Sequence, residues 1–334
     1  MFENKKILIT GGTGSLGQAL TKKLLKTDVD TIRIFSRNES KQVQMESEIK
    51  DKRLRFLIGD IRDLSRLEKA LEGVDIVFHT AALKHVPVVE YNPFEAIKTN
   101  ILGAQNLIDA CLKENVETVV GISTDKAVSP LNTYGATKLL MEKLLTTAQN
   151  YLDIDKYRTK FLAVRYGNVV GSSGSVIPKF IQQIKSNEKI RITDSQMTRF
   201  SITMDDALDL IINASKIGKG SEVFVPKLKA YNIMDVKSAL FELLHETEYE
   251  IVGIRPGEKL HETLINEDEI RYTWNIKDMF MIRNPHYELF NDVNLETNYE
   301  TNEKENNLNS YSSDKVEKLT INELKIVIKN SGLL

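Results

Sequence analysis

The sequence contains few of the residues that build disulfides and metal sites. Cys111 is the only cysteine among 334 residues, and it lies in the helix-like stretch NLIDACLK. A lone cysteine forms no internal disulfide and no metal cluster, so we expect a reducing, cytoplasmic environment. The five histidines, at positions 79, 85, 245, 261 and 286, show no metal-ligand spacing. The sequence therefore predicts no metal site.

Long apolar runs and an excess of charge of one sign are also missing. No stretch approaches the roughly 18 apolar residues that a membrane-spanning helix needs, and MFENKK passes into ILIT without the apolar core of a signal peptide. The net charge of −2 recruits neither nucleic acid nor an anionic membrane. With 41% apolar and 28% charged residues, the composition is that of a globular protein. We therefore expect a soluble intracellular protein without a nucleic-acid partner, in which local groups hold any bound anion.

Short apolar runs alternate with helical patterns from residue 1 to about residue 170. The expected strands are residues 5–10, 31–35, 54–58, 75–79, 117–123 and 160–166. Near-continuous apolar strands that alternate with helices indicate a parallel sheet covered on both faces. The sequence therefore predicts an α/β fold, with a Rossmann-type doubly wound domain over residues 1–170.

The pattern changes after residue 170. The loops GSSGSVIP and GIRPGEK separate further helices, which indicates a smaller substrate-binding lobe with a C-terminal tail over residues 171–334 and some strand exchange between the lobes. Residues 297–313 are polar and rich in Asn and Glu, which is typical of a mobile excursion. An amphipathic helix is expected near residues 320–330.

A glycine cluster follows the first expected strand, in ITGGTGSLGQAL. The cluster matches two glycine patterns. Gly11, Gly14 and Gly17 form G-x-x-G-x-x-G, and Gly12, Gly14 and Gly17 form G-x-G-x-x-G. Such glycines permit a tight turn, and the following helix presents its N-terminal amides to a pyrophosphate. Because the cluster lies between a strand and an amphipathic helix, it predicts a dinucleotide site.

The end of the second strand bears on the choice of dinucleotide. It reads IFSRNESK, with Ser36 and Arg37 where an NAD site usually carries an acid. A hydroxyl and a guanidinium suit a 2′-phosphate, which favours NADP over NAD. The alternative is that Arg37 is only a solvated surface residue. Asp60, after the third strand, is either an acceptor for the adenine edge or a loop cap.

Residues 121–138, GISTDKAVSPLNTYGATK, combine several groups that can carry protons. Tyr134 and Lys138 are spaced i, i+4 and therefore share a helix face. The ammonium, with a nicotinamide nearby, would lower the pKa of the phenol so that Tyr134 acts as a base. Tyr311 and Lys315 have the same spacing, but only Tyr134 follows a sheet strand, and active residues of open α/β folds collect at the carboxyl ends of strands.

The glycine motif, STDKA, YGATK, RYGNV, GSVIP, MTRF and GIRPGEK together resemble the extended short-chain dehydrogenases/reductases of polysaccharide biosynthesis. The resemblance runs in unbroken order over about residues 3–290 and is nearest to the inverting UDP-N-acetylglucosamine 4,6-dehydratases of pseudaminic acid synthesis. It implies a hydro-lyase that uses NADP, acts on UDP-N-acetylglucosamine or a similar nucleotide sugar, and assembles as a homo-oligomer, a dimer or a hexamer.

The resemblance also implies a mechanism. Tyr134 takes the proton of the sugar 4-OH, polarised by Thr124, while hydride moves from C4 to NADP⁺. Lys126 then removes H5, Asp125 protonates the departing 6-OH, the hydride returns to C6, and C5 is reprotonated on its opposite face. A lysine base requires a lowered pKa, from burial and from cations such as Lys138 and the nicotinamide, and an acid at Asp125 requires a raised one.

The motifs and the resemblance together define the expected contacts. We expect the cofactor at Gly11, Thr13, Gly14, Ser15, Leu16, Gly17, Ser36, Arg37, Lys41, Asp60, Ile61, Ala81, Ala82, Lys84, Asn100, Tyr134 and Lys138. We expect the substrate at Lys84, Asn168, Ser175, Val176, Thr193, Arg199, Arg255 and Glu258. Arg199 and Arg255 are the expected diphosphate ligands, with Glu258 on the uridine ribose. The alternatives are that Arg199 caps a helix and that Lys84 only pairs with Glu90.

Other functions remain open from the sequence. A dehydratase that retains the C5 configuration carries an Asp-Glu pair where this chain has Asp125 and Lys126. A 4-epimerase, which only oxidises and re-reduces C4, has no use for that acid and base. A non-catalytic NADP-binding regulator would keep the glycine loop but would not need Tyr134 and Lys138. The neutral alternative for Asp125 and Lys126 is a solvated turn before Pro130.

Overall fold

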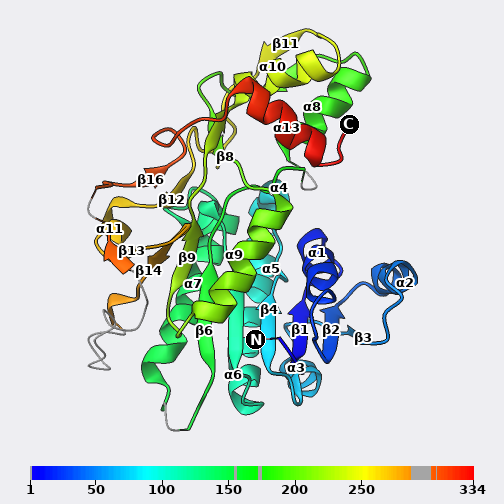
Figure 1. Ribbon diagram of the computed structural model, residues 1–334, viewed down its shortest axis with the longest axis vertical. Helices are drawn as coiled ribbons and strands as arrows, with labels where there is room; N and C mark the ends of the chain where they lie inside the picture. The colour runs from blue at the N-terminus through cyan, green and yellow to red at the C-terminus, as the bar shows by residue number, and fades with distance from the viewer. Residues whose placement is uncertain (1, 154–155, 172–174, 287–301, 306) are drawn as a thin grey trace.

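A central sheet of ten strands organises the molecule (Figure 1). The computed structural model describes residues 2–153, 156–171, 175–286, 302–305 and 307–334. The first six strands are β1 (Lys6–Thr10), β2 (Thr31–Ser36), β3 (Leu54–Ile58), β4 (Ile76–His79), β5 (Thr118–Ile122) and β6 (Lys160–Val164). They are parallel, in the order β3-β2-β1-β4-β5-β6, which is the order of a doubly wound dinucleotide-binding sheet. The predicted α/β Rossmann-type fold is confirmed.

Helices cover both faces of these strands. On one face, Ile7 and Ile9 of β1 pack with Leu20 of α1 (Ser15–Leu24) and with Ile211 of α9 (Met204–Ile217). On the other, Leu8 belongs to a cluster with residues of α3 (Leu64–Leu71), α6 (Gly103–Lys113) and α7 (Thr133–Ala148). Burying each such side chain stabilises the fold by about 1.5–3 kcal/mol. Strands with apolar residues on both faces therefore occupy the middle of the sheet, as the sequence predicts.

Strands from beyond residue 170 extend one edge of the same sheet. β9 (Val223–Pro226) adds to β6 in parallel, and β14 (Met279–Ile282), β13 (Thr273–Ile276) and β15 (Asn302–Lys304) then follow antiparallel. The chain thus returns to the Rossmann sheet after entering the smaller lobe. The division of the chain at residue 170 stays a prediction.

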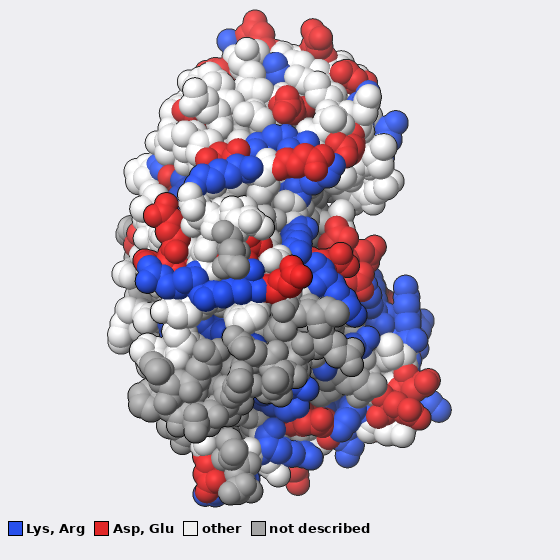
Figure 2. All heavy atoms as spheres, turned by 60° about the vertical axis from the view of Figure 1, so that its left-hand side comes forward, with Lys and Arg blue, Asp and Glu red and all other residues white. Residues whose placement is uncertain are grey.

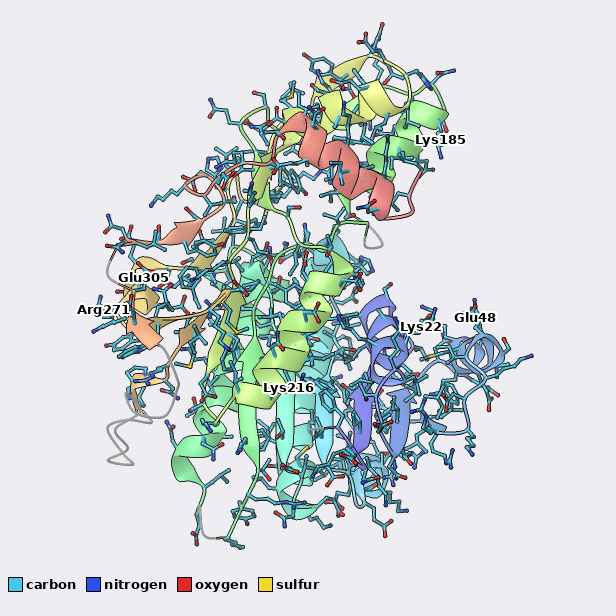
Figure 3. The ribbon with its side chains drawn as sticks, in the orientation of Figure 1. Lys22, Glu48, Lys185, Lys216, Arg271 and Glu305 are labelled. Atoms are coloured by element: carbon cyan, nitrogen blue, oxygen red, sulfur yellow. The ribbon has the colours of Figure 1, made fainter. Side chains whose placement is uncertain are left out.

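A smaller lobe lies at the carboxyl edge of the parallel strands, at the top of Figure 1. It contains α8 (Val176–Lys185), β7 (Ile190–Ile192), β8 (Thr198–Phe200), β10 (Ala230–Asn232), α10 (Ile233–Leu243), β11 (Tyr249–Ile251) and α13 (Ile321–Asn330). Phe180, Leu240 and Ile328 share its core. The outline of the molecule is indented between the two lobes, and acidic and basic side chains are interspersed over the visible face (Figure 2). Lys22 of α1 and Lys185 of α8 point outward (Figure 3).

The remaining elements are short or peripheral. They are α2 (Glu39–Glu48), α4 (Val86–Tyr91), α5 (Pro93–Ala96), the π-helical η1 (Ile97–Leu102), the 3₁₀ turns η2 (Asp125–Ala127) and η3 (Gln149–Tyr151), α11 (Glu267–Ile270), β12 (Thr263–Ile265) and β16 (Tyr311–Ser312). No helix in the described ranges is long and apolar enough to cross a membrane.

The polar tail is more ordered than predicted. β15 pairs with β13 and β16 pairs with β12, so the mobile excursion predicted for residues 297–313 is wrong for residues 302–305 and 307–313. The ring of Tyr311 lies 5.2 Å from that of Phe200 and 5.0 Å from that of Phe280. Buried apolar surface on Tyr311 therefore fixes a segment whose composition is polar. Residues 297–301 and 306 lie outside the described residues.

Candidate active site

The carboxyl ends of β1 to β4 border a cleft of about 340 Å³. α1 begins beside it, with Gly14 as the N-cap. Gly11 has a φ of +66°, and a Cβ there would lie 2.8 Å from the Ala81 backbone. A Cβ on Gly17 would lie 2.6 Å from the backbone of Gly12. The glycines therefore allow the turn and the close packing that bring the N-terminal amides of α1 to the cleft.

Many of the predicted cofactor residues line this cleft. They are Gly11, Thr13, Gly14, Ser36, Arg37, Lys41, Asp60, Ile61, Ala81 and Ala82, and the cleft adds Phe35, Asn38, Gly59 and Thr99, which the motifs do not mark. Of the other predicted residues, Ser15, Leu16 and Gly17 lie in the first turn of α1, and Lys84 is exposed.

Cations border the cleft at the end of β2. The side chain of Arg37 is about half exposed, and its Nη1 lies 3.8 Å from Asp60 Oδ2. Asp60 is engaged more closely by Arg62, at 2.6 Å, and it also accepts the Arg62 N–H. Burial would raise the pKa of Asp60, but the bonds from Arg62 lower it below its ordinary value. Asp60 therefore fits the loop-cap alternative, while Arg37 and Lys41 leave positive charge at the cleft.

Asn100, which lies in η1, connects two segments of the site by hydrogen bonds. Its Oδ1 accepts the Leu83 N–H at 2.8 Å, and its Nδ2 donates to Leu83 O and to Thr137 Oγ1, both at 3.0 Å. The fully buried amide thereby joins the loop after β4 to α7. Asn100 thus supports the walls of the site, and π-helical turns are frequent at such places.

An acid–base cluster follows β5. Asp125 is 1% exposed, and its Oδ1 accepts from Lys126 Nζ at 3.0 Å and from Thr124 Oγ1 at 2.8 Å. Lys126 Nζ also donates to Asn168 Oδ1 at 3.3 Å, from the loop after β6. The structure therefore brings together four of the predicted site residues.

The protonation of Lys126 differs from the prediction. Burial by itself would lower the pKa of Lys126, but Asp125 and Glu262 outweigh burial and raise it above its ordinary value. The predicted lowered pKa is wrong for this arrangement, because two carboxylates rather than cations dominate the surroundings of the amine. Lys126 Nζ and Asp125 Oδ1 form an ion pair, 3.0 Å apart.

Tyr134 and Lys138 lie on α7, which Asn132 caps by accepting the Gly135 N–H. Burial raises the pKa of Tyr134 to about 12, although Lys126 and a hydrogen bond with Thr124 act to lower it. Burial lowers the pKa of Lys138 to about 8, and its Nζ lies 3.1 Å from Met141 Sδ. The predicted lowering of the Tyr134 pKa is therefore wrong here, and the nearby cation that opposes burial is Lys126.

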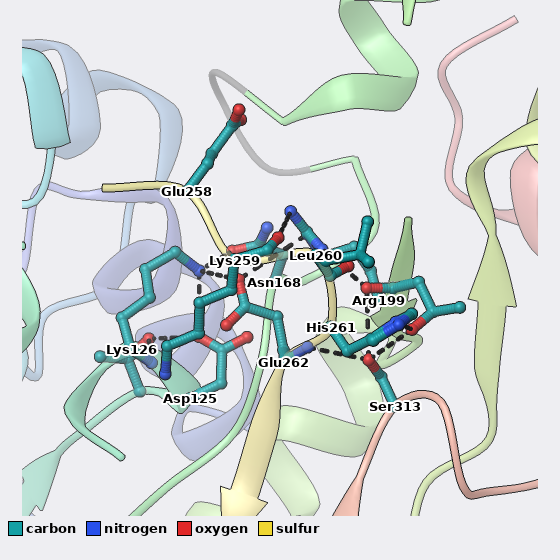
Figure 4. Close-up of polar contacts among 12 residues, drawn as sticks. Asp125, Lys126, Asn168, Arg199, Glu258, Lys259, Leu260, His261, Glu262 and Ser313 are labelled. Atoms are coloured by element: carbon teal, nitrogen blue, oxygen red, sulfur yellow. Dashed lines mark hydrogen bonds and ion pairs between the residues drawn. The ribbon is translucent and has the colours of Figure 1, made fainter. Parts of the chain in front are cut away.

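The segment before β12 contributes residues that the motifs do not mark as functional. Glu262 lies 3.6 Å from Lys126 and 3.7 Å from Arg199, and Lys259 Nζ donates to Val128 O (Figure 4). Asn132 Nδ2 donates to Gly257 O at 2.9 Å. Glu262 lies three residues past the end of the GIRPGEK motif, so a longer motif could have suggested it.

The predicted substrate residues are spread around this cluster. Arg199 is buried on β8 and donates to the carbonyls of Thr198, Lys259 and Leu260. It therefore fixes the adjoining loop and caps no helix. Figure 4 shows Glu258 directed away from Lys126, and its Oε2 accepts the Arg255 N–H at 3.3 Å.

The remaining predicted substrate contacts lie apart from the cluster. Ser175 is at the N-cap position of α8 without a side-chain cap hydrogen bond, Val176 begins that helix, and Thr193 is buried just after β7. Glu90 accepts the Thr133 N–H, and no ion pair to Lys84 occurs within 4.0 Å in the described ranges. Within the same ranges, no group of three His, Cys, Asp or Glu side chains is placed to hold a metal.

Known proteins share most of this chain. It is 44% identical over 319 residues to the UDP-N-acetylglucosamine 4,6-dehydratase (inverting) of Campylobacter jejuni, with 94% of each chain covered. It is 40% identical over 336 residues to the UDP-glucose 4-epimerase of Rickettsia bellii, with 99% of this chain and 97% of that one covered. Relatives of similar identity thus have names with two different activities.

Solved structures agree with the fold. The X-ray structure of Pen from Bacillus thuringiensis matches with a TM-score of 0.91 at 41% identity, covering 100% of this chain and 99% of that one. DesIV, a dTDP-glucose 4,6-dehydratase from Streptomyces venezuelae with NAD bound, matches with a TM-score of 0.67 at 22% identity, covering 76% and 86%. Residues 7–284 match the family described as polysaccharide biosynthesis protein. The chain therefore belongs to the polysaccharide biosynthesis protein family and has the fold of the extended short-chain dehydrogenases/reductases.

Proposed function

We propose that the protein is an inverting UDP-N-acetylglucosamine 4,6-dehydratase that uses NADP. The observation that carries this proposal is the ion pair of Asp125 and Lys126, 3.0 Å apart, beside Thr124 and Tyr134. Dehydration moves two protons at neighbouring sugar carbons, so it needs an acid and a base together. The similarity to the Campylobacter dehydratase over 94% of the chain supports the same assignment.

The residues around the cleft fit NADP. Gly11 and Gly17 leave no room for a Cβ, so their backbone can approach a pyrophosphate at the start of α1. Ser36, Arg37 and Lys41 supply a hydroxyl and two cations where a 2′-phosphate would lie. When bound, the nicotinamide accepts a hydride from C4 of the sugar and later returns it to C6.

The side chains of the cluster supply the proton transfers. Tyr134 takes the proton of the 4-OH as a phenolate, so its own phenol proton first passes to solvent. The charge of Lys126 and the hydrogen bond with Thr124 favour the phenolate, and burial opposes it. Lys126 then passes one proton from Nζ to Asp125 Oδ1, which converts the ion pair into an amine and a carboxylic acid. The amine takes H5, and Asp125 protonates the departing 6-OH. No proton has to come from solvent before water leaves.

A UDP-sugar 4-epimerase is the second candidate, because relatives at 40% identity have that name. Epimerisation at C4 needs a hydride acceptor and one proton carrier, and it needs no group at C5 or C6. A buried ion pair is costly to retain without use. Asp125 and Lys126 therefore favour the dehydratase.

Incubation with UDP-N-acetylglucosamine in D₂O, followed by proton NMR, tests the proposal. A dehydratase that inverts C5 gives a 4-keto-6-deoxy sugar of L-arabino configuration with deuterium at C5. Retained configuration at C5 would contradict inversion, and a C4 epimer would identify an epimerase. Unchanged sugar with NADP bound would identify a non-catalytic regulator.

We further propose a cytoplasmic homo-oligomer, a dimer or a hexamer, that supplies pseudaminic acid synthesis. The single cysteine, Cys111, is buried and free, which suits a reducing compartment. Tyr91 of α4, Phe94 of α5 and Leu140 of α7 are exposed apolar side chains on helices that contact one another. Apolar surface of this kind marks an interaction site.

A further inference from the structure

Glu262 is a buried carboxylate that the mechanism above does not use. Its side chain is 4% exposed, and its Oε1 lies 3.6 Å from Lys126 Nζ and 3.7 Å from Arg199 Nε. Its Oε2 is buried and has no hydrogen-bond partner in the part of the chain that the structure describes. A buried carboxylate is costly unless it is paired, so its place depends on these two cations.

The backbone at Glu262 is fixed by the C-terminal tail. The Glu262 N–H donates to Ser313 Oγ at 2.9 Å, and the Ser313 N–H donates to Glu262 O at 2.8 Å. Ser313 Oγ also shares a hydrogen bond of 2.7 Å with Thr198 Oγ1. Ser313 is fully buried, so the carboxylate projects toward Lys126 from a rigid base.

The partner on the other side of the carboxylate is fixed as well. Arg199 Nη1 donates to Thr198 O at 2.7 Å and to Leu260 O at 3.0 Å, and its Nη2 donates to Lys259 O at 3.0 Å. The guanidinium therefore has little freedom to follow a ligand. Lys126, at 20%, has the most exposed side chain of the group formed by Arg199, Glu262, Lys126 and Asp125.

We propose that Glu262 is a positioning residue of the acid–base site: its carboxylate, shared with Arg199, holds the Lys126 amine beside Asp125 and keeps it charged until it passes its proton to Asp125. This inference rests on the proposed function. In that transfer an N–H bond of Lys126 breaks and an O–H bond forms on Asp125, and Glu262 takes no part in the exchange. Glu262 thus contributes through Lys126 rather than by contact with the reacting carbons.

Lys126 is surrounded by charged and titratable groups from several elements. They are Asp125 on η2, Tyr134 on α7, Arg199 on β8, Tyr231 on β10, and Lys259 and Glu262 before β12. Without the charge of Glu262, Asp125 would be the one carboxylate of this group left to offset the positive charges of Arg199 and Lys259 near the Lys126 amine. An opposite charge within about 4–6 Å changes a pKa by about 1–3, so loss of the Glu262 charge lowers the pKa of Lys126.

Competitive acylation of the full-length protein, followed by mass spectrometry, measures the titration of the Lys126 amine without turnover. In Glu262→Gln, the pH at which this amine becomes reactive should fall by about one pH unit or more. Glu262→Asp, which keeps the charge, should titrate closer to the wild type. Glu250→Gln is the control, because Glu250 pairs with Arg191 on an exposed edge. An unchanged Lys126 titration in a folded Glu262→Gln protein would overturn the inference.

The pH dependence of turnover separates this inference from the proposed function. If the wild type dehydrates UDP-N-acetylglucosamine, the alkaline limb of the pH–rate profile of Glu262→Gln should lie at lower pH than that of the wild type. An unmoved limb would contradict the positioning role of Glu262 and leave the proposed function standing. If the wild type leaves the sugar unchanged, the proposed function fails while the acylation result still decides the role of Glu262. If Glu262→Gln does not fold, Arg199→Gln tests the same group of charges. Loss of the Arg199 cation should move the titration of the Lys126 amine to higher pH. An unchanged titration of Lys126 in this variant would overturn the inference.

Discussion

A lysine removes a proton from carbon only as a neutral amine, yet Lys126 rests in an ion pair with Asp125. Its ammonium has three acceptors around it, since Asn168 Oδ1 lies at 3.3 Å and Glu262 Oε1 at 3.6 Å. Proton transfer to Asp125 creates the base and the acid in one step. Because the protonation states of Lys126 and Asp125 are coupled in this way, the mechanism does not require a lowered pKa on Lys126 and a separately raised pKa on Asp125.

Lys126→Ala tests the base directly. Because a positioned general base contributes about 10²–10⁴-fold, dehydration should fall by at least about 10²-fold. NADP binding, measured by fluorescence titration, should be unchanged, since Lys126 lies outside the cofactor cleft. Lys216→Ala, an exposed change on α9, is the control. Loss of NADP binding together with activity would mean that Lys126 is structural.

Arg37→Ser tests the choice of dinucleotide. Hydrogen bonds to a charged group contribute about 1.5–3 kcal/mol, so NADP should bind about 10- to 150-fold more weakly. NAD, which has no 2′-phosphate, should bind within a few-fold of the wild type. Isothermal titration with each nucleotide measures both, and Arg271→Ser, a change at an exposed arginine, should alter neither. An equal loss for both nucleotides would contradict a role at the 2′-phosphate.

At the scale of elements, periodicity and turn signals predict the parallel strands closely, because each strand from β1 to β6 is a compact apolar run that a sheet buries. β15 and β16 were not predicted from the sequence, and the reason is physical. β15 and β16 are short, polar in sequence, and paired with strands 26 to 49 residues earlier, such as Trp274 opposite Lys304 and Thr263 opposite Ser312. Long-range pairing of this kind leaves no local periodicity.

The candidate site also combines residues that local sequence patterns reveal with residues that only the fold brings together. The spacing of Tyr134 and Lys138 and the adjacency of Asp125 and Lys126 are local, so the sequence reveals them. Glu262 enters the site through the fold, and its position depends on Ser313, which is 51 residues away. The pKa of Lys126 is raised first by Asp125, its neighbour in sequence, and then by Glu262, and only the second contribution comes from a distant part of the chain.

A buried ion triad joins three elements behind the site. Arg165 at the end of β6 is 1% exposed and pairs with Glu142 of α7 and Glu269 of α11. It also donates to Leu264 O at 2.8 Å. Burial would raise the pKa of Glu269, but the charge and hydrogen bonds of Arg165 outweigh burial and lower it. The triad therefore couples the catalytic helix to the segment that follows Glu262.

Arg165→Met should lower the free energy of unfolding at pH 7 by about 3–5 kcal/mol, because it leaves the buried carboxylate of Glu142 and the partly buried one of Glu269 uncompensated. Glu269 has a lowered pKa in the folded protein, so its stabilising contribution is present above the unfolded value of about 4.3 and is lost as the pH falls through the folded value. The difference between wild type and variant should therefore narrow in acid. Urea unfolding at pH 7 and at a series of pH values below 4 measures this.

Arg271→Met is the matched control, since Arg271 pairs with Asp268 in solvent. It should change the unfolding free energy by no more than about 0.5 kcal/mol. A similar small effect of Arg165→Met would mean that the triad contributes little to stability.

At the scale of the whole molecule, the site forms where the two lobes meet. The segments that follow β5 and β6 of the large sheet supply Asp125, Lys126 and Asn168. β8 and the segment before β12 supply Arg199 and Glu262 (Figure 4). Hydrogen bonds from Lys259 to Val128 and from Asn132 to Gly257 cross between these parts. Movement of one lobe against the other would separate the acid–base pair from its counter-charges, so rigidity between the lobes serves the chemistry.

The exposed apolar side chains of α4, α5 and α7 lie outside that site, and the proposed homo-oligomer would form through them. Tyr91 is 89% exposed and Phe94 is 61% exposed, and burial of each against a second copy would contribute about 1.5–3 kcal/mol. Tyr91→Asp combined with Phe94→Asp would place two charges in that interface, so light scattering after gel filtration should show monomers at micromolar concentration. Ile326→Asp, at an exposed position on α13, should leave the mass of the assembly unchanged. If the double variant kept the wild-type mass, the chains would have to associate through a different face, and the apolar helices would need another partner.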